Sequence, residues 1–191
     1  MWPDVYCAGR EETFTFLEKV LTHVMELFPG RYIHIGGDEC PKTRWKACPK
    51  CQARIQAEGL QNEHELQSYF IRGIEQFLIA NGRRLIGWDE ILEGGLAPNA
   101  TVQSWRGMEG AVTAALSKRH AIVSPTSHAY FDYPLTSIDV ETVYGFEPVP
   151  RMLKPSEAEY ILGGECNMWT ERAPQQVVTG TRADGTGGRN P

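Results

Sequence analysis

Apolar residues recur along this chain in two alternating rhythms, one typical of helices and the other of short buried strands. Residues 11–28 and 62–81 carry apolar side chains three and four positions apart, which predicts two amphipathic helices. A helix rich in small residues is expected at 108–119, and a short one near 52–58. Short apolar runs predict buried strands at 31–36, 84–88, 100–105, 121–124 and 160–163. Strands that alternate with helices in this way predict a parallel sheet covered by helices.

Aromatic and acidic side chains follow the end of each predicted strand. They are Asp38 and Glu39, Trp88, Trp105, Tyr130 and Asp132, and Trp169 and Glu171. Functional residues gather at this end of the strands both in a (β/α)8 barrel and in a doubly wound sheet. No Gly-x-Gly-x-x-Gly segment opens a helix after the first strand, and no Walker-type loop is present. The pattern therefore predicts a ligand site at the strand ends and leaves both α/β architectures open.

The segment Arg31-Tyr-Ile-His-Ile-Gly-Gly-Asp-Glu-Cys40 joins a buried strand to two adjacent carboxylates. Its two glycines carry no side-chain bulk, so another group can approach the backbone closely. Repulsion between Asp38 and Glu39, together with partial burial, favours keeping one of them protonated near neutral pH. Such a group can act as a general acid. The alternative is a solvated turn or a helix N-terminus, where acids suit the helix dipole.

Size and charge narrow the classes of protein. The chain has 191 residues, of which 41% are hydrophobic and 23% charged, as in an ordinary soluble domain. A net charge of −5 argues against a nucleic-acid partner. No apolar run approaches the roughly 20 residues that span a bilayer, and the first residues lack the features of a signal peptide. Residues 173–191 are expected to form a disordered tail, because Gly, Thr and Arg dominate from Thr179 onward.

Five cysteines introduce a separate question. Cys48-Pro-Lys-Cys51 has the spacing of half a zinc site, with Cys40 and Cys7 as candidates for the third and fourth ligands. Cys166 is the fifth, so the odd number leaves at least one thiol without an intramolecular disulfide partner. A structural zinc, disulfides and ordinary thiols in a loop all remain open at this point.

The strand-end residues suit a sugar ligand. Indole rings stack on the C–H faces of sugars, and carboxylates bind their hydroxyls. A retaining glycosidase commonly places two carboxylates roughly 5 Å apart on either side of the scissile bond. Asp38 and Glu39 are neighbours in sequence and are poorly placed to flank a bond. A substrate with a 2-acetamido group removes the difficulty, because its own carbonyl oxygen can attack the anomeric carbon and form an oxazolinium-type ring.

The stretch from His34 to Glu39, His-Ile-Gly-Gly-Asp-Glu, resembles the signature of glycoside hydrolase family 20, the β-N-acetylhexosaminidases. Four further motifs match that family in order: Gly87-Trp88-Asp89-Glu90, Ser104-Trp105-Arg106-Gly107, Tyr130-Phe131-Asp132 and Trp169-Thr170-Glu171. The resemblance implies a (β/α)8 TIM-type barrel. Residues 1–172 are expected to hold about strands four to eight of it. The chain would then lack the N-terminal part of its own barrel and show little or no activity alone.

The resemblance also implies a role for each matching position. Glu39 would protonate the leaving oxygen and later activate water, Asp38 would hold the acetamide nitrogen, and Tyr130 would bind the acetamide oxygen. Sugar-binding roles fall to Trp88, Trp105, Asp132, Trp169 and Glu171. His34 is expected to support the strand end, and Asp89 and Glu90 to be structural neighbours of Trp88. No cofactor and no catalytic metal are expected.

The implied function is that of a retaining exo-glycosidase that removes terminal β-linked N-acetylglucosamine or N-acetylgalactosamine from glycans or glycoconjugates. Relatives of this kind suggest a periplasmic, extracellular or lysosomal location. One alternative is a non-catalytic carbohydrate-binding module or pseudoenzyme, against which the retained acid pair argues. A metal-dependent hydrolase that uses the cysteines is the least favoured, because clustered thiolates are typical of a structural clamp.

Overall fold

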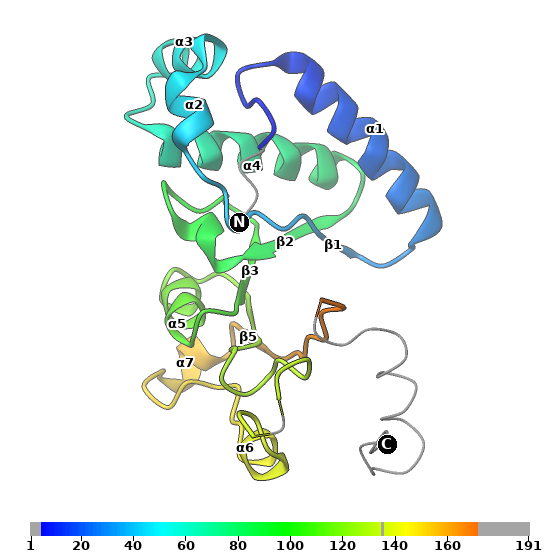
Figure 1. Cartoon of the computed structure of the whole chain (residues 1–191), viewed down its shortest axis with the longest axis vertical. Helices are drawn as coiled ribbons and strands as arrows, with labels where there is room; N and C mark the ends of the chain where they lie inside the picture. Colours follow the sequence, from blue (N-terminus) through cyan, green and yellow to red (C-terminus); the bar gives the residue numbers. More distant parts are fainter. Residues whose placement is uncertain (1–4, 135, 172–191) are drawn as a thin grey trace, which may run out of the picture.

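Five parallel strands form the centre of the molecule in the computed structural model, which describes residues 5–134 and 136–171 (Figure 1). The strands are β1 (Tyr32–His34), β2 (Arg84–Trp88), β3 (Thr101–Ser104), β4 (Ala121–Val123) and β5 (Ile161–Gly164). They lie side by side in chain order, and each pairs in parallel with the next. A doubly wound sheet reverses its strand order at a switch point, whereas consecutive barrel strands do not. The described sheet therefore has the order of a barrel segment.

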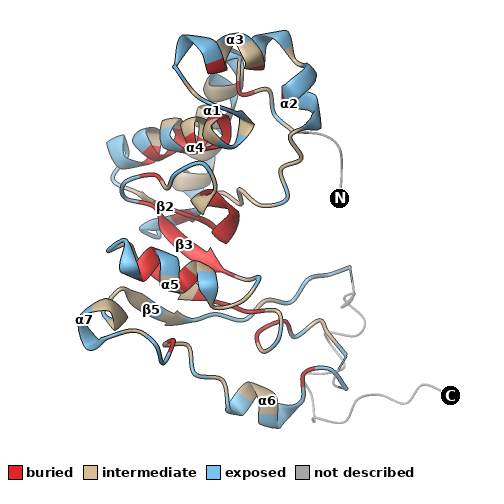
Figure 2. Ribbon diagram, turned by 90° about the vertical axis from the view of Figure 1, so that its left-hand side faces the viewer, coloured by how far each residue is buried: buried red, intermediate tan, exposed pale blue. Residues whose placement is uncertain are grey.

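The two middle strands are buried on both faces. All four residues of β3 are buried, and so are the last four of β2 (Figure 2). Leu85 and Val102 have no exposed surface at all. Burial on both faces is typical of parallel strands that have helices on one side and a filled interior on the other.

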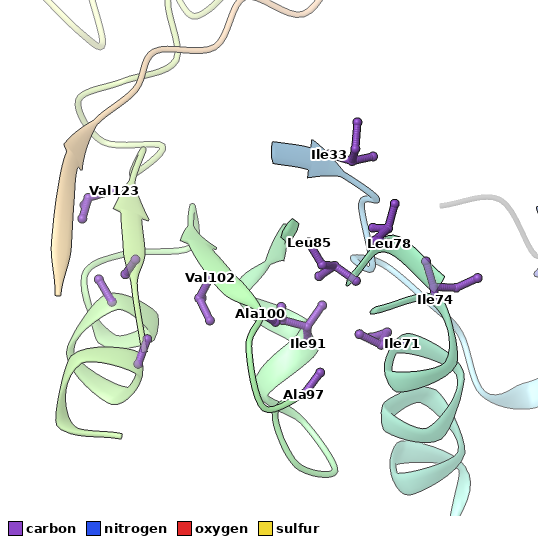
Figure 3. Packing of buried hydrophobic residues seen from close by; sticks show 13 residues of the cluster. Ile33, Ile71, Ile74, Leu78, Leu85, Ile91, Ala97, Ala100, Val102 and Val123 are labelled. Atoms are coloured by element: carbon purple, nitrogen blue, oxygen red, sulfur yellow. The ribbon is translucent and has the colours of Figure 1, made fainter. Parts of the chain in front are cut away.

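Helices α1 (Glu11–Leu27), α4 (Glu63–Ala80) and α5 (Glu109–Leu116) follow the predicted ranges closely. Asn62 caps α4, because its side-chain oxygen accepts hydrogen bonds from two backbone amides of the first turn. Ile71, Ile74 and Leu78 of α4 belong to the same buried cluster as Leu85 of β2, and Ile71 points toward Ile91 in the turn that follows β2 (Figure 3). Helix α1 packs along α4 and has no residue in the buried class.

Several short elements escaped the sequence pattern. The helix expected near 52–58 is α3 (Pro49–Ala57), and an unpredicted helix, α2 (Thr43–Ala47), precedes it. The 3-10 turn η1 (Asp89–Leu92) follows β2, and α6 (Val140–Tyr144) and α7 (Pro155–Ala158) lie between β4 and β5. Helices of four or five residues give no readable apolar period. Packing stabilises them instead, as in the second core cluster around Trp45, Cys51, Ile55 and Leu66.

Two expectations concern the limits of the chain and the membrane. The predicted tail at 173–191 lies outside the described residues. Among the helices that the structure describes, none is long and apolar enough to cross a membrane.

Candidate active site

A single cavity of about 420 Å³ lies at the C-terminal ends of the strands. Its lining contains all eight residues predicted from the sequence, together with Tyr133: Asp38, Glu39, Trp88, Trp105, Tyr130, Asp132, Tyr133, Trp169 and Glu171. They come from the ends of all five described strands and the loops after them. This volume is within the range of small-molecule sites in proteins.

Aromatic rings make a continuous wall of this cavity, with Trp88 at its centre. The Trp88 ring centroid lies 6.3 Å from that of Trp105 and 6.2 Å from that of Trp169. Tyr130 extends the wall, because its ring stacks on Trp105 at 29° with the centroids 6.4 Å apart. Trp88 is 8% exposed and Trp169 43%, so the wall is anchored in the core and open at its rim.

Asp89 and Glu90 follow Trp88 in the sequence, but their side chains bind Trp105. The indole nitrogen of Trp105 donates a hydrogen bond of 2.9 Å to the Glu90 carboxylate. The backbone amide of Trp105 donates to Asp89 over 3.2 Å, and Asp89 also forms an ion pair of 2.6 Å with Arg106. The two acids thus have a structural role, as expected, but their contacts are with Trp105 and Arg106. Their place in η1, directly after β2, turns them toward the end of β3.

The acid pair stands at the end of β1 on an unusual backbone. Gly36 and Gly37 have φ values of 77° and 88°, and Glu39 has a φ of 43°, all in the left-handed region. A residue other than glycine in this region costs free energy and is often found at functional sites. Glu39 is exposed and Asp38 is half-buried. The backbone thus turns both carboxylates into the cavity from one short loop.

Burial raises the pKa of the Asp38 carboxyl, a backbone hydrogen bond opposes this shift, and the charge of Glu39 adds to it. The burial and repulsion expected from the sequence therefore both act on Asp38. The resemblance, by contrast, gives the proton-donating role to Glu39. The place in the family motif therefore indicates Glu39 as the proton donor, whereas the raised pKa indicates Asp38. Variants of the two residues can separate these roles.

Hydrogen bonds from neighbouring elements fix the loop that carries these acids. The Gly36 carbonyl accepts the Trp88 amide over 2.9 Å, which continues the pairing of β1 with β2 past the strand end. The side chain of Gln67, on α4, donates a bond of 2.8 Å to the Gly37 carbonyl. His34 accepts the Gly36 amide over 3.1 Å, and its ring lies 4.8 Å from that of Trp88. His34 thus supports the strand end, and burial lowers its pKa.

Tyr130 remains a hydrogen-bond donor over a wide pH range. Burial raises the pKa of its phenol to about 12, although a hydrogen bond with Trp169 opposes this. Its backbone pairs with that of Asn167 in an isolated parallel bridge, which joins the loops after β4 and β5. The phenol is therefore held in place by the same contact that brings Trp169 to the pocket.

Asp132 carries a buried oxygen, Oδ1, that has no hydrogen-bond partner among the described residues. A buried acceptor left in this state is costly unless a ligand or water satisfies it. Glu171 lines the same cavity from an exposed position. Both carboxylates are thus available to donors on a bound molecule, as sugar hydroxyls would be.

Some contributors to the site were missed in the sequence. Tyr133 lines the cavity, and its place in the aromatic run after β4 was a usable signal. Gln67 gave no signal, because a polar residue inside a helix normally faces solvent. Gln103 supports the floor, since its side chain donates to Ser124 over 3.0 Å and also to Glu165. Burial raises the pKa of Glu165.

Comparison with known proteins agrees with this architecture. Residues 2–182 match the profile described as "Glycosyl hydrolase family 20, catalytic domain". The chain belongs to glycosyl hydrolase family 20, and its described sheet is part of the TIM barrel of that family.

Among curated relatives, a "Beta-hexosaminidase" of Porphyromonas gingivalis is 49% identical over 180 residues, which is 88% of this chain and 23% of the relative. A "Beta-hexosaminidase" of Vibrio furnissii is 32% identical over 178 residues, or 86% of this chain and 29% of the relative. The chain thus spans about a quarter of the length of these curated relatives.

Among solved structures, the beta-N-acetylhexosaminidase of Bacteroides fragilis aligns with a TM-score of 0.79 and 29% identity, over 95% of this chain and 40% of that one. The chitobiase of Flavobacterium johnsoniae aligns with a TM-score of 0.79 and 33% identity, over 90% of this chain and 27% of that one. The arrangement of the described strands is therefore that of experimentally determined family members.

Proposed function

We propose that this chain carries the acid pair and the aromatic pocket of the active site of a retaining exo-β-N-acetylhexosaminidase. The substrate would be a glycan or glycoconjugate that ends in β-linked N-acetylglucosamine or N-acetylgalactosamine. The observation that carries the proposal is the meeting of an adjacent acid pair with three tryptophans and a buried tyrosine in one cavity at the strand ends. Membership in the family and the names of its relatives support the same reaction class.

In the proposed first step, the carbonyl oxygen of the substrate's acetamide attacks the anomeric carbon while the bond to the leaving oxygen breaks. Glu39 gives its proton to that oxygen. The Asp38 carboxylate accepts the acetamide N–H and stabilises the positive charge that develops on the ring. Tyr130 donates its phenolic hydrogen to the acetamide oxygen and orients it for attack.

In the second step, water attacks the anomeric carbon from the side that the leaving group vacated. The Glu39 carboxylate takes a proton from this water, and the oxazolinium ring opens. Two inversions at one carbon give net retention. The three indole rings hold the acetamide and the sugar face, and Asp132 and Glu171 bind hydroxyls. No step calls on a metal or a cofactor.

The experiment is a pair of substitutions in the full-length enzyme. Glu39→Gln should slow hydrolysis of poor leaving groups by about 10²–10⁴-fold and that of activated aryl leaving groups far less, because only the former need a proton. Asp38→Asn should slow both alike, because orientation of the acetamide precedes either departure. Steady-state kcat/KM on an alkyl and a nitrophenyl N-acetylglucosaminide measures the difference.

The same two variants also show which of the two carboxyl groups donates the proton. Leaving-group dependence in Asp38→Asn in place of Glu39→Gln would exchange the two roles. Wild-type rates in both variants would remove the acid pair from the mechanism. Equal cleavage of plain glucosides and their N-acetylated counterparts by the wild type would contradict substrate assistance. Sugar binding without turnover would instead favour the carbohydrate-binding module.

A further inference from the structure

Three cysteine sulfurs meet where the segment before α1 lies against the start of α3. Cys7 lies in the segment before α1, while Cys48 and Cys51 lie at the N-terminus of α3. The Cys7 sulfur is 3.7 Å from that of Cys48 and 3.6 Å from that of Cys51. All three sulfurs lie within 4.8 Å of one another. Cys40, a candidate ligand from the sequence, is outside this group, so the structure selects a different set of thiols.

We propose that Cys7, Cys48 and Cys51 supply thiolate ligands to a structural Zn²⁺ ion. Zinc bonds to thiolate sulfur at about 2.3 Å, so two ligands of a tetrahedral site lie about 3.8 Å apart. The two separations from Cys7 come close to this edge length. Among the described residues, no further Cys, His, Asp or Glu belongs to the group.

Backbone amides are arranged around these sulfurs as they would be around thiolates. The Cys48 sulfur has backbone hydrogen bonds with Cys51 and Lys50. The Cys51 sulfur has a backbone hydrogen bond with Gly9. A dication beside a buried sulfur would supply the positive charge that a buried thiolate needs, and its binding would release the thiol protons.

The protein brings the two segments together without help from the ion. The Trp45 indole nitrogen donates a hydrogen bond of 2.8 Å to the Tyr6 carbonyl, and the Thr13 hydroxyl donates one of 2.9 Å to the Cys7 carbonyl. A Cβ at Gly9 would lie only 2.6 Å from the Cys51 backbone nitrogen, so only glycine permits this approach. In Figure 1 the dark blue segment before α1 passes beside α2 and α3.

The ion would tie the start of the described chain to a polar segment with little core of its own. Only Trp45, Cys51 and Ile55 are buried in α2 and α3. Such a small cluster gains much from a metal that fixes three ligands. The inference is independent of the glycosidase reaction, because the three thiols do not line the active-site cavity.

The test is metal analysis of the full-length protein, purified under reducing conditions without a chelator. We expect one equivalent of zinc per chain by plasma mass spectrometry, and loss of that zinc in Cys7→Ser, Cys48→Ser and Cys51→Ser. Cys166→Ser and Cys40→Ser are the matched controls and should retain it. Loss of zinc in Cys40→Ser as well would overturn the three-thiol assignment.

A second measurement on the unmodified protein guards against variants that fail to fold. Removal of zinc with a chelator followed by addition of Co²⁺ should give a thiolate-to-metal absorption band in the near ultraviolet. Chelation should also lower the Tm, and zinc should restore it. A reduced protein that takes up neither metal would overturn the proposal, as would a disulfide between Cys7 and Cys48 or Cys51 in a protein that contains no metal.

Discussion

At the level of single residues, the pocket depends on side chains that hold other side chains in place through hydrogen bonds. Glu90 accepts the indole N–H of Trp105, and Asp89 accepts the backbone amide of the same residue. Burial raises the pKa of Glu90, while the bond from Trp105 opposes the shift. Without the Trp105 N–H, the buried Glu90 carboxylate would lose this hydrogen bond at a cost in free energy. The orientation of Trp105 in the pocket wall is thus set by Asp89 and Glu90.

Asp38 should make the folded protein less stable at neutral pH than a neutral residue in its place would. Its folded pKa is raised, so the folded state binds the proton more tightly than the unfolded state does. Stability contributed by this group is therefore present at low pH and is lost as pH rises through the folded pKa. We expect Asp38→Asn to raise the Tm at pH 7 and to lose that advantage at a pH below about 3.9.

Thermal unfolding of the full-length protein at both pH values measures this effect. Glu159→Gln is the matched control, because Glu159 is exposed directly after α7 and should leave the Tm unchanged at both. A lower Tm for Asp38→Asn at neutral pH would show that its charge is compensated in the fold. The gain in stability would accompany the loss of activity expected from the same variant.

At the scale of elements, the turn after β1 decides where the acid pair stands. Gly37 has a φ of 88°, and a Cβ there would lie 2.7 Å from the Ile91 side chain in η1. The turn therefore fits closely over the element that follows β2. Neither the apolar period of the strand nor the length of the loop specifies this fit.

Gly37→Ala should destabilise the protein by about 1–3 kcal/mol, because both the backbone and the space are unsuitable for a side chain. It should also lower kcat/KM by displacing both carboxylates. Gly30→Ala is the control, since nothing lies within 4 Å of a Cβ at that position. Chemical denaturation and steady-state kinetics of the full-length enzyme measure the two effects. Equal behaviour of the two variants would mean that the turn adjusts without consequence.

At the scale of the whole molecule, the described sheet has two open edges. Among the described strands, β1 pairs only with β2, and β5 only with β4. Helix α1 and the residue after it expose Phe16, Leu27 and Phe28 by 52%, 62% and 62%. Open strand edges and apolar faces favour association with further chain. The aligned structure of the Bacteroides fragilis enzyme contains additional polypeptide, because the present chain covers 40% of it.

We therefore expect the 191 residues expressed alone to self-associate and to show little or no turnover. Size-exclusion chromatography and hydrolysis of an aryl N-acetylglucosaminide measure the two properties. The full-length enzyme under the same conditions is the control. Robust turnover by a monomer of the isolated chain would mean that the described residues of the site are sufficient for catalysis.

The pattern along the chain was enough to predict the parallel α/β arrangement, the approximate bounds of the longer elements, and eight residues that the structure places around one cavity. These features are local: strand ends carry their motifs in fixed order, and the sheet brings those ends to one edge. The contacts between side chains far apart in the chain became visible only in the folded molecule. It joined Cys7 to Cys48 and Cys51 without Cys40, and turned Glu90 toward Trp105. It also placed Gln67 under the acid pair. Such contacts depend on how helices pack and which way side chains point, and neither is written in a linear pattern.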